Sequence, residues 1–376
     1  MMAMPETSAN DDLNTSLHGL PPELQTALAS LVDPVLNESY LSLDALQIDT
    51  IEPLALTVRP GYPMNSKLAA LSLGLRSRMD IAGFPGTAIR LEPDVVPAPS
   101  PAQSGHLAGV RNIVMVASGK GGVGKSTTAV NLALALQAEG ASVGMLDADI
   151  YGPSQRTMLG VAEDVQPELV DGKFLKPIVR FGVRSMSVGY LSAEKTPMVW
   201  RGPMATRALQ QLLEQTIWGD LDYLIIDMPP GTGDIQISLA QRLKVSGALI
   251  VTTPQEVALI DARKGIEMFA KVGIPVLGLV ENMATHICTN CGHEDDIFGQ
   301  GGASKLAAEY DLPVLGSLPL DKSIREGADA GLPSVVADPM GPMAQAYFRL
   351  AHATGGQLWK QNLRSGEPAE ILLTES

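Results

Sequence analysis

The sequence predicts an α/β fold, with a mostly parallel sheet covered by helices on both faces, joined to a small N-terminal α+β domain. After residue 111, short continuous apolar runs alternate with helically periodic segments, which is typical of parallel strands buried on both faces. A glycine-rich segment directly follows the first of these apolar runs. A stretch rich in Pro, Ala, Ser and Gly separates this region from the smaller domain.

The N-terminal part of the chain predicts a leader followed by the small domain. Residues 1–19 are polar and acidic, so we expect a disordered leader. Residues 20–92 combine helical and strand-like patterns, which indicates a compact α+β unit. Its expected elements are helices at 23–31 and 65–79 and strands at 51–58 and 87–91.

The remainder of the chain predicts a linker, the large α/β domain and a tail. Residues 93–110 indicate a semi-extended linker, 111–360 the α/β domain, and 361–376 a polar, weakly structured tail. The expected strands are 113–117, 143–146, 223–226, 248–251 and 275–280, and one of the helices between them is 126–137. Because ligands of such sheets bind beyond the carboxyl ends of the strands, the motifs that follow these strands should share one edge.

The composition of the whole chain narrows the classes of function. With 376 residues, 45% of them hydrophobic and 18% charged, the chain is globular. Its net charge of −14 argues against broad binding to nucleic acid or to anionic lipid. No apolar run approaches the roughly 20 residues of a membrane helix, and the acidic N-terminus is not a secretory signal. We therefore expect a cytoplasmic protein with no nucleic-acid or membrane partner.

Residues 118–127, SGKGGVGKST, describe a loop that holds phosphates. They fit the pattern G-x-x-x-x-G-K-[ST] between a strand and a helix. Lys125 would reach the β and γ phosphates of ATP, and Ser126 would supply a hydroxyl to Mg²⁺. The predicted nucleotide-binding residues here are Gly119, Lys120, Gly121, Gly122, Val123, Gly124, Lys125, Ser126 and Thr127. One lysine suffices for a phosphate site, so Lys120 needs another explanation.

Aspartates follow two further strands. Asp149 is interpreted as facing the γ phosphate, where a carboxylate can orient or deprotonate the attacking water. For Asp147, a part in the nucleotide site and a structural role as the cap of the next segment fit the sequence equally well. Asp227 ends an apolar run, the position expected for an aspartate that holds Mg²⁺. The segment after it contains Gly231, and its glycines leave the backbone free to approach the γ phosphate.

An amide follows the strand at 275–280. Asn282 offers both a donor and an acceptor, so it could pair with the edge of a purine base. An asparagine that merely forms a turn fits the local sequence equally well.

The two cysteines of the chain, Cys288 and Cys291, form one C-x-x-C motif. The acidic residues that follow oppose thiolate formation without a metal, so a metal site is favoured over a redox pair. His286 and His293 could complete a mononuclear zinc site, although a solvated loop is the simpler interpretation of both. Since a zinc ion or an iron–sulfur cluster typically takes about four ligands, the other arrangement is a symmetric dimer that shares one centre.

The loop GKGGVGKST, with Lys120, resembles the deviant phosphate loop of the MinD/ParA/nitrogenase-iron-protein class. The resemblance implies a homodimer in which Lys120 reaches the nucleotide of the partner. It also implies a Mg²⁺-dependent ATPase in which Lys120, Lys125 and Asp149 act in hydrolysis, Asp227 lies on the Mg²⁺ side and Asn282 contacts the base.

Within this class, the chain resembles the Mrp family of iron–sulfur cluster carrier ATPases. The motifs that carry the resemblance are LDADIYGPS, WRGPM, DMPPGTGD, the C-x-x-C after VENM, and PLDKSIREGADAG, in that order. The resemblance implies a labile [4Fe–4S] cluster on Cys288 and Cys291 of two chains, iron–sulfur assembly proteins as donors and apoproteins as clients. The alternatives are a MinD/ParA-like positioning or partitioning ATPase and a P-loop ATPase with structural zinc on the C-x-x-C motif.

The N-terminal unit resembles the MIP18-like domain that is fused to many bacterial members of the Mrp family. Residues 27–46 follow the opening pattern of that domain. Where the domain often carries Cys-Pro, this chain has Tyr62 and Pro63. We therefore expect this unit to dock a partner and not to hold a cluster.

Overall fold

A computed structural model describes residues 19–99, 105–191, 202–288 and 290–366. The chain divides into two compact units, Met1–Val96 with Gly355–Ser376, and Pro97–Thr354. The predicted leader up to residue 18 and the end of the predicted tail, 367–376, lie outside the described residues. So do Trp200 and Arg201 of the WRGPM motif.

The first unit contains helices on a three-stranded sheet. In the described part of this unit the elements are α2 (Pro22–Ala29), β1 (Leu46–Ile51), β2 (Leu54–Val58), η1 (Asn65–Lys67), α3 (Leu68–Ile81) and β3 (Ala88–Leu91). Strand β2 lies in the middle, antiparallel to β1 and parallel to β3.

The predicted strand at 51–58 is wrong as a single element, because the structure divides this region into the hairpin β1–β2. The chain turns between Ile51 and Leu54, where Pro53 has no N–H to donate to a ladder. Most of β1 is exposed or half-buried, and its sequence mixes apolar with polar residues and lacks the apolar run that marked β2.

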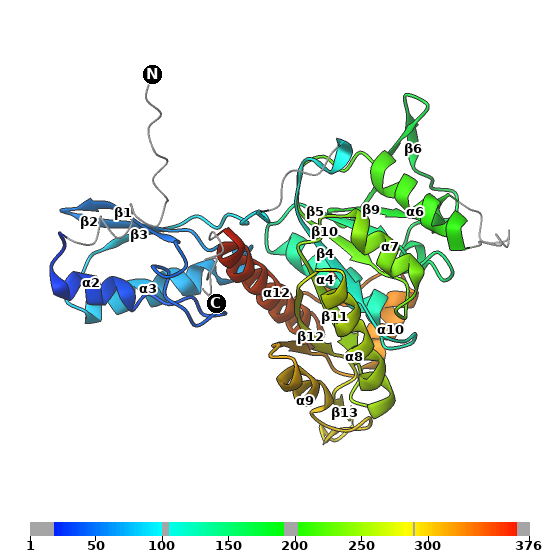
Figure 1. Cartoon of the computed structure of the whole chain (residues 1–376). Helices are drawn as coiled ribbons and strands as arrows, with labels where there is room; N and C mark the ends of the chain where they lie inside the picture. Colours follow the sequence, from blue (N-terminus) through cyan, green and yellow to red (C-terminus); the bar gives the residue numbers. More distant parts are fainter. Residues whose placement is uncertain (1–18, 100–104, 192–201, 289, 367–376) are drawn as a thin grey trace, which may run out of the picture. The chain divides into compact units, whose positions relative to one another are not determined.

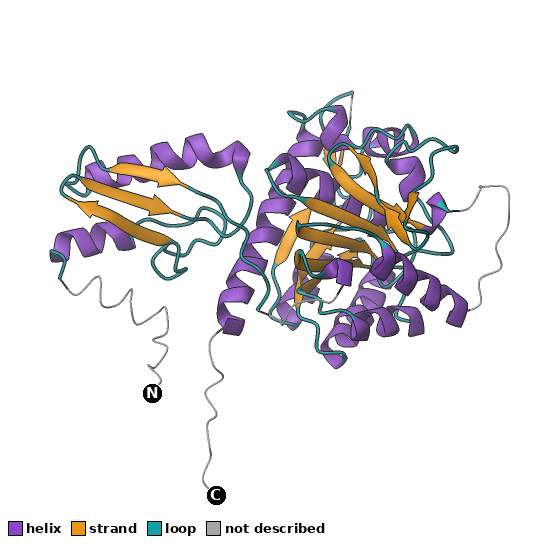
Figure 2. Cartoon of the chain, turned by 90° about the horizontal axis from the view of Figure 1, so that it is seen from above, coloured by secondary structure: helices purple, strands orange, loops and turns teal. Residues whose placement is uncertain are grey.

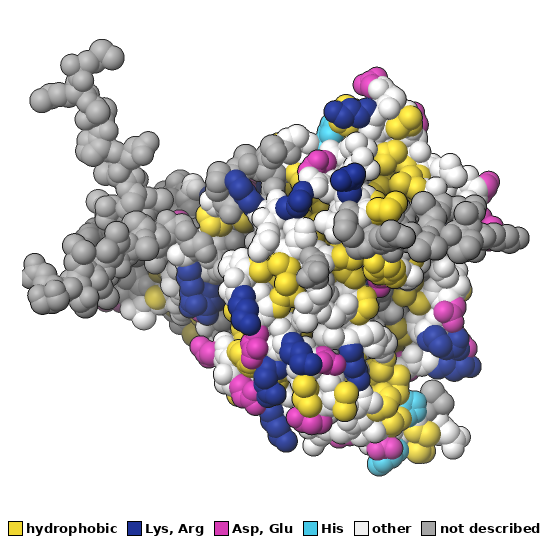
Figure 3. All heavy atoms as spheres, turned by 45° about the vertical axis from the view of Figure 1, so that its right-hand side comes forward, with side chains coloured by type: hydrophobic (Ala, Val, Ile, Leu, Met, Phe, Trp, Pro, Cys, Tyr) yellow, Lys and Arg dark blue, Asp and Glu magenta, His cyan; other side chains and the backbone are white. Residues whose placement is uncertain are grey.

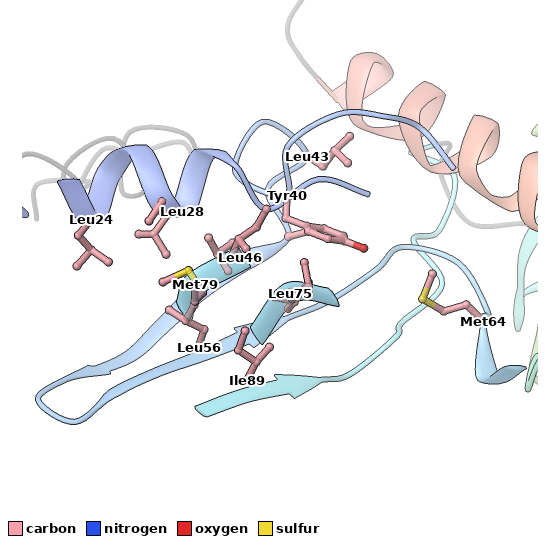
Figure 4. Packing of buried hydrophobic residues seen from close by; sticks show 14 of the residues in the cluster. Leu24, Leu28, Tyr40, Leu43, Leu46, Leu56, Met64, Leu75, Met79 and Ile89 are labelled. Carbon is pink, nitrogen blue, oxygen red and sulfur yellow. The ribbon is translucent and has the colours of Figure 1, made fainter. Parts of the chain in front are cut away.

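The core of the first unit lies between its helices and its sheet. Leu28 of α2 and Met79 of α3 point toward Leu56 of β2 and Ile89 of β3 (Figure 4). The cluster also includes Trp359 from α12 (Pro342–Gly366). The expectation of a weakly structured tail from residue 361 is therefore wrong up to residue 366, because this helix continues through it.

Part of the predicted linker is structured. The backbone N–H groups of Asp94 and Val96 donate to the carbonyls of Pro60 and Gly61 at 3.0 and 3.2 Å. Farther along, residues Gly105–Leu107 form the 3₁₀ helix η2. Residues 93–98 carry no helix or strand, and β4 begins at Val110, so among the described residues regular structure appears only at the C-terminal end of the predicted linker.

The second unit holds the large sheet. Its described elements are η2, β4 (Val110–Ala117), α4 (Lys125–Ala138), β5 (Val143–Asp147), α5 (Gln155–Met158), β6 (Glu168–Val170), β7 (Phe174–Lys176), β8 (Ile178–Arg180), β9 (Val183–Ser187), η3 (Val188–Tyr190), α6 (Gly202–Gln215), β10 (Leu221–Asp227), α7 (Asp234–Arg242), β11 (Gly247–Thr252), α8 (Glu256–Lys271), β12 (Val276–Glu281), β13 (His286–Ile287), β14 (Glu294–Asp295), α9 (Gly302–Glu309), β15 (Val314–Ser317), α10 (Lys322–Asp329), α11 (Ser334–Ala337) and the first part of α12.

Eight of the described strands of the second unit form one sheet in the order β15-β12-β11-β4-β10-β5-β9-β8, and β6-β7 and β13-β14 form two separate two-stranded sheets. The central strands β4, β10 and β5 of the large sheet are labelled in Figure 1. Every neighbouring pair is parallel except β8 and β9. Helices lie on both sides of this sheet (Figure 2). The predicted fold class is confirmed, and each predicted strand corresponds to one of the five strands β4, β5, β10, β11 and β12.

The central strands are apolar because helices cover them on both faces. All residues of β5 and of β11 are buried, which agrees with the continuous apolar runs in the sequence. On the face shown in Figure 3, lysine and arginine side chains lie among aspartate and glutamate side chains. Across the residues that the structure describes, no helix has the length and apolar character needed to cross a membrane.

Candidate nucleotide site and cysteine pair

The glycine-rich loop joins β4 to α4, so its residues end at the first turn of a helix. Helix α4 begins at Lys125, and Gly124 before it has a φ of 83°. An L-residue rarely adopts this left-handed conformation, which explains the glycine. The loop thus directs backbone N–H groups and the positive end of a helix toward one place, the arrangement that binds phosphate.

Two close contacts fix the shape of this loop. Asn282, 8% exposed, donates from Nδ2 to the Val123 carbonyl at 2.8 Å. A methyl group on Gly124 would lie 2.0 Å from the same Nδ2 atom. At the other end of the loop, a methyl group on Gly119 would lie 2.2 Å from the backbone of Asp261 in α8. Neighbouring elements therefore leave room only for glycine at both positions.

Strand β10 lies between β4 and β5, which brings the lysine of the loop next to an aspartate. Asp227 pairs in register with Val116 on one side and with Asp147 on the other. Lys125, 6% exposed, forms an ion pair through Nζ with Asp227 Oδ1, and its Nζ lies 3.1 Å from Ser126 Oγ. The three side chains that sequence patterns assigned to phosphate and Mg²⁺ thus lie together.

Asp147 is fully buried and holds the loop that contains Asp149. Its Oδ2 accepts from Ser187 Oγ at 3.0 Å and from the N–H groups of Ser154 and Gln155 at 3.2 and 3.3 Å. Its Oδ1 accepts from the N–H of Asp149 at 3.2 Å. The carboxylate therefore caps the segment that follows β5, one of the two interpretations that the sequence left open.

The surroundings of Asp147 favour its neutral form. Burial, and then the negative charge of Asp227, raise the pKa of Asp147 to about 7. The positive charge of Lys125, which forms an ion pair with Asp227, acts in the opposite direction and lowers the pKa of Asp147.

The remaining residues predicted for the nucleotide site lie in the loops after β4, β5 and β10. Asp149 is half-buried, and its Oδ1 accepts from the N–H of Gly152 at 3.2 Å. Gly231 donates its N–H to the Ser118 carbonyl at 3.0 Å, which joins the segment after β10 to the glycine-rich loop. Lys120 is half-buried, whereas Gly121 and Gly122 are exposed. The loop is therefore open to solvent at its tip.

Sequence reasoning missed Gln155, which lies within the same group of side chains. Its Nε2 donates to Asp227 Oδ2 at 3.0 Å, and the residue is 1% exposed. A polar residue that follows Gly-Pro-Ser after a strand carries no pattern of its own. Only its hydrogen bond to Asp227 in the folded chain reveals it.

The cysteine pair lies in the turn between β13 and β14. Gly292 donates its N–H to the Cys288 carbonyl at 2.8 Å, and Cys288 donates its own to the His293 carbonyl at 2.8 Å. Cys288 is half-buried and Cys291 exposed. The backbone N–H groups of Cys291 and Asn290 hold the pKa of the Cys288 thiol below its usual value. This tight turn favours the thiolate, the form that binds metal.

The His286 side chain has a partner outside this turn. His286 Nδ1 lies 3.0 Å from the Leu320 carbonyl. Within the described ranges, no group of three or more His, Cys, Asp or Glu side chains is placed to hold a metal ion. The structure therefore does not bring His286 and His293 together with both thiols as one zinc site.

Comparison with known proteins identifies relatives along most of the chain. The family described as "ParA: NUBPL iron-transfer P-loop NTPase" matches residues 109–354. An iron–sulfur cluster carrier protein from Pseudomonas fragi is 58% identical over 74% of this chain and 98% of its own length. A protein of the same name from Deinococcus radiodurans is 44% identical over 89% of this chain and 95% of its own length.

A solved structure supports the assignment of the large unit. A nucleotide-binding protein from Archaeoglobus fulgidus, solved in complex with ADP, is 36% identical to this chain. It superposes with a TM-score of 0.56 over 65% of this chain and 94% of its own. Since the family match also covers more than half of the sequence, the chain belongs to the NUBPL iron-transfer P-loop NTPase family.

Proposed function

We propose that this protein is an ATP-dependent carrier that binds a labile [4Fe–4S] cluster as cargo between two copies of the chain and transfers it to apoproteins. The main support for the proposal is that one segment of the chain runs from the nucleotide site to the cysteines. Strand β12 ends beside Asn282, whose amide contacts the glycine-rich loop, and the chain continues from there to Cys288 and Cys291. One short segment thus connects the nucleotide site with the thiols.

The nucleotide half of the proposal depends on the groups around Lys125. This lysine would leave Asp227 to bind the β and γ phosphates of ATP. Ser126 and Asp227 would then offer hard oxygen ligands, which suit Mg²⁺. Asp149 would orient the attacking water, because it follows β5 at the same edge of the sheet. Bound Mg²⁺ would neutralise charge that develops on the phosphates during hydrolysis.

The cluster half depends on stoichiometry. The chain has two cysteines, whereas a [4Fe–4S] cluster typically takes four thiolates. Two copies related by a two-fold axis would supply them from one shared site. Lys120, half-buried in an otherwise open loop, would contact the nucleotide of the partner and would link dimer geometry to ATP. The Pseudomonas fragi relative, named an iron–sulfur cluster carrier protein, supports this proposal.

The proposed cluster also indicates which proteins would deliver it and receive it. A cluster on a half-buried and an exposed thiol of each chain would be accessible to other proteins. We therefore propose iron–sulfur assembly proteins as donors, apo iron–sulfur proteins as clients, and the cytoplasm as the place of exchange.

Anaerobic reconstitution with iron and sulfide tests the proposal. The wild type should develop a broad charge-transfer absorption and about four iron and four sulfide per dimer, as the cluster formula requires. Cys288→Ala should abolish both signals. His293→Ala is the matched control in the same turn and should keep them. An unchanged spectrum in Cys288→Ala, or stoichiometric zinc without iron in protein from iron-replete cells, would contradict the proposed cargo.

A further inference from the structure

Gln155 contacts both buried carboxylates of the nucleotide site. Its backbone N–H donates to Asp147 Oδ2 at 3.3 Å, and its side-chain Nε2 donates to Asp227 Oδ2 at 3.0 Å. The residue is 1% exposed and begins helix α5. It therefore joins the loop of Asp149 to the aspartate on the Mg²⁺ side.

The orientation of its amide follows from the chemistry of its neighbours. Ionised Asp227 can only accept hydrogen bonds, so the nitrogen of the Gln155 amide must face it. Oε1 is then fixed on the same planar group, close to the Asp227 carboxylate. This oxygen is buried and has no hydrogen-bond partner within the described part of the chain. Among the residues that the structure describes, the neighbouring Ser154 Oγ is likewise buried without a hydrogen-bond partner.

A buried amide oxygen without a partner is costly, at roughly 1–3 kcal/mol. Such an atom beside a phosphate and metal site suggests a partner that arrives with the ligand. Mg²⁺ keeps several of its waters when it binds to proteins, and those waters donate hydrogen bonds. An acceptor next to Asp227 suits such a water.

The two oxygens of Asp227 are divided between two partners. Lys125 Nζ contacts Oδ1, and Gln155 Nε2 contacts Oδ2. If Lys125 turns to the phosphates, Oδ1 becomes available while Oδ2 stays fixed. The carboxylate would then keep one orientation while the lysine changes its partner.

We propose that Gln155 is a positioning residue of the Mg²⁺ site, which fixes Asp227 through Nε2 and accepts from a metal-bound water through Oε1. The inference rests on the proposed binding of Mg²⁺ and nucleotide. It does not depend on the cluster. Removal of such a supporting hydrogen bond commonly weakens metal binding 10- to 100-fold.

Binding of Mn²⁺ to the full-length protein in the presence of ADP tests the proposal, with free Mn²⁺ measured by electron paramagnetic resonance. Gln155→Met keeps the length of the side chain and removes both polar atoms. We expect it to raise the dissociation constant for Mn²⁺ about tenfold or more. The affinity for ADP in EDTA should stay within twofold of wild type, which a general loosening of the fold would not allow.

Gln236→Met is the matched control. Gln236 is also 1% exposed, and its Oε1 has no hydrogen-bond partner among the described residues, but its Nε2 donates to the Pro229 carbonyl and not to Asp227. Its Mn²⁺ affinity should stay within twofold of wild type. Should Gln155→Met fail to fold, Gln155→Asn, with its shorter amide side chain, serves instead. It should also raise the dissociation constant for Mn²⁺.

Three results from the variants would overturn the inference. They are unchanged Mn²⁺ affinity in Gln155→Met, equal weakening in Gln236→Met, and parallel loss of ADP affinity in EDTA. If wild type bound no Mn²⁺ with ADP, both this inference and the proposed ATPase would fail. If Mn²⁺ bound as expected but no cluster assembled, only the carrier function would fail.

Discussion

Single residues in the glycine-rich loop are fixed by neighbours from distant parts of the sequence. The ion pair of Lys125 and Asp227 is almost fully buried, and breaking a buried pair by removing one partner typically costs about 3–5 kcal/mol. Asn282 contacts the loop from the end of β12. The loop is therefore shaped before any phosphate arrives, which reduces the ordering that binding requires.

Gly124→Ala should destabilise the protein and impair nucleotide binding. The left-handed φ of 83° costs roughly 1–2 kcal/mol for a residue with a side chain. In addition, the new methyl group would collide with Asn282 Nδ2. Thermal unfolding of the nucleotide-free protein should show a lower midpoint, and titration with a fluorescent ATP analogue should show weaker binding.

Gly121→Ala is the control for that change within the same loop. A methyl group there meets no atom within 4 Å, so the unfolding midpoint should stay at the wild-type value. Combining Gly124→Ala with Asn282→Ala should recover part of the loss, because the second change removes the colliding amide. Equal midpoints for Gly121→Ala and Gly124→Ala would refute this account.

At the scale of elements, helix α12 completes the core of the first unit. Trp359 is 2% exposed, with its ring centroid 6.5 Å from that of Tyr40 and 6.0 Å from that of Tyr62. A methyl group on Gly61 would lie 2.4 Å from the same indole ring. The small N-terminal sheet thus closes its core with a residue from near the other end of the chain.

Trp359→Ala should loosen the first unit selectively. Loss of a buried aromatic side chain typically costs about 3–5 kcal/mol. Hydrogen exchange followed by mass spectrometry should therefore become faster in peptides from residues 19–96 and stay unchanged in β4 and α4. Gln357→Ala, a half-buried change on the same helix, should leave exchange as in wild type. Unchanged protection in Trp359→Ala would show that the helix does not stabilise this unit.

At the scale of the whole molecule, the proposed activity requires two copies. Each chain carries two thiols and one glycine-rich loop, so both the cluster and the contact of Lys120 with nucleotide depend on association. Nucleotide would bind the dimer more tightly than the monomer, and this difference in affinity would shift the equilibrium toward the dimer.

Lys120→Ala should separate nucleotide binding from dimer formation. Sedimentation of wild type with Mg²⁺ and a non-hydrolysable ATP analogue should show dimers, whereas the variant should stay monomeric. Its own nucleotide affinity should change only a few-fold, because Lys125 remains. Lys271→Ala, an exposed lysine in the last turn of α8, is the control and should dimerise normally. Full dimerisation of Lys120→Ala would remove the proposed role in the partner's site.

The sequence by itself determined the fold of the large unit and the type of its ligand. The strands β4, β5, β10, β11 and β12 were predictable because burial on both faces demands continuous apolar runs. The glycine-rich loop was readable because its backbone conformation and its lysine allow few substitutes. A partner for Asp227 was predictable, because burying a carboxylate at the end of an apolar strand is costly unless an ion pair or hydrogen bonds compensate it.

Only the tertiary structure decided which groups meet across the chain. The hairpin β1–β2, the contribution of α12 to the first unit, and Gln155 beside Asp227 left no local pattern. An exposed edge strand needs no apolar run, and a single buried glutamine or tryptophan has no periodicity. The contacts of such residues are with residues that lie far away in the sequence. Only packing in the folded chain brings the two within the distance of a hydrogen bond or a ring contact.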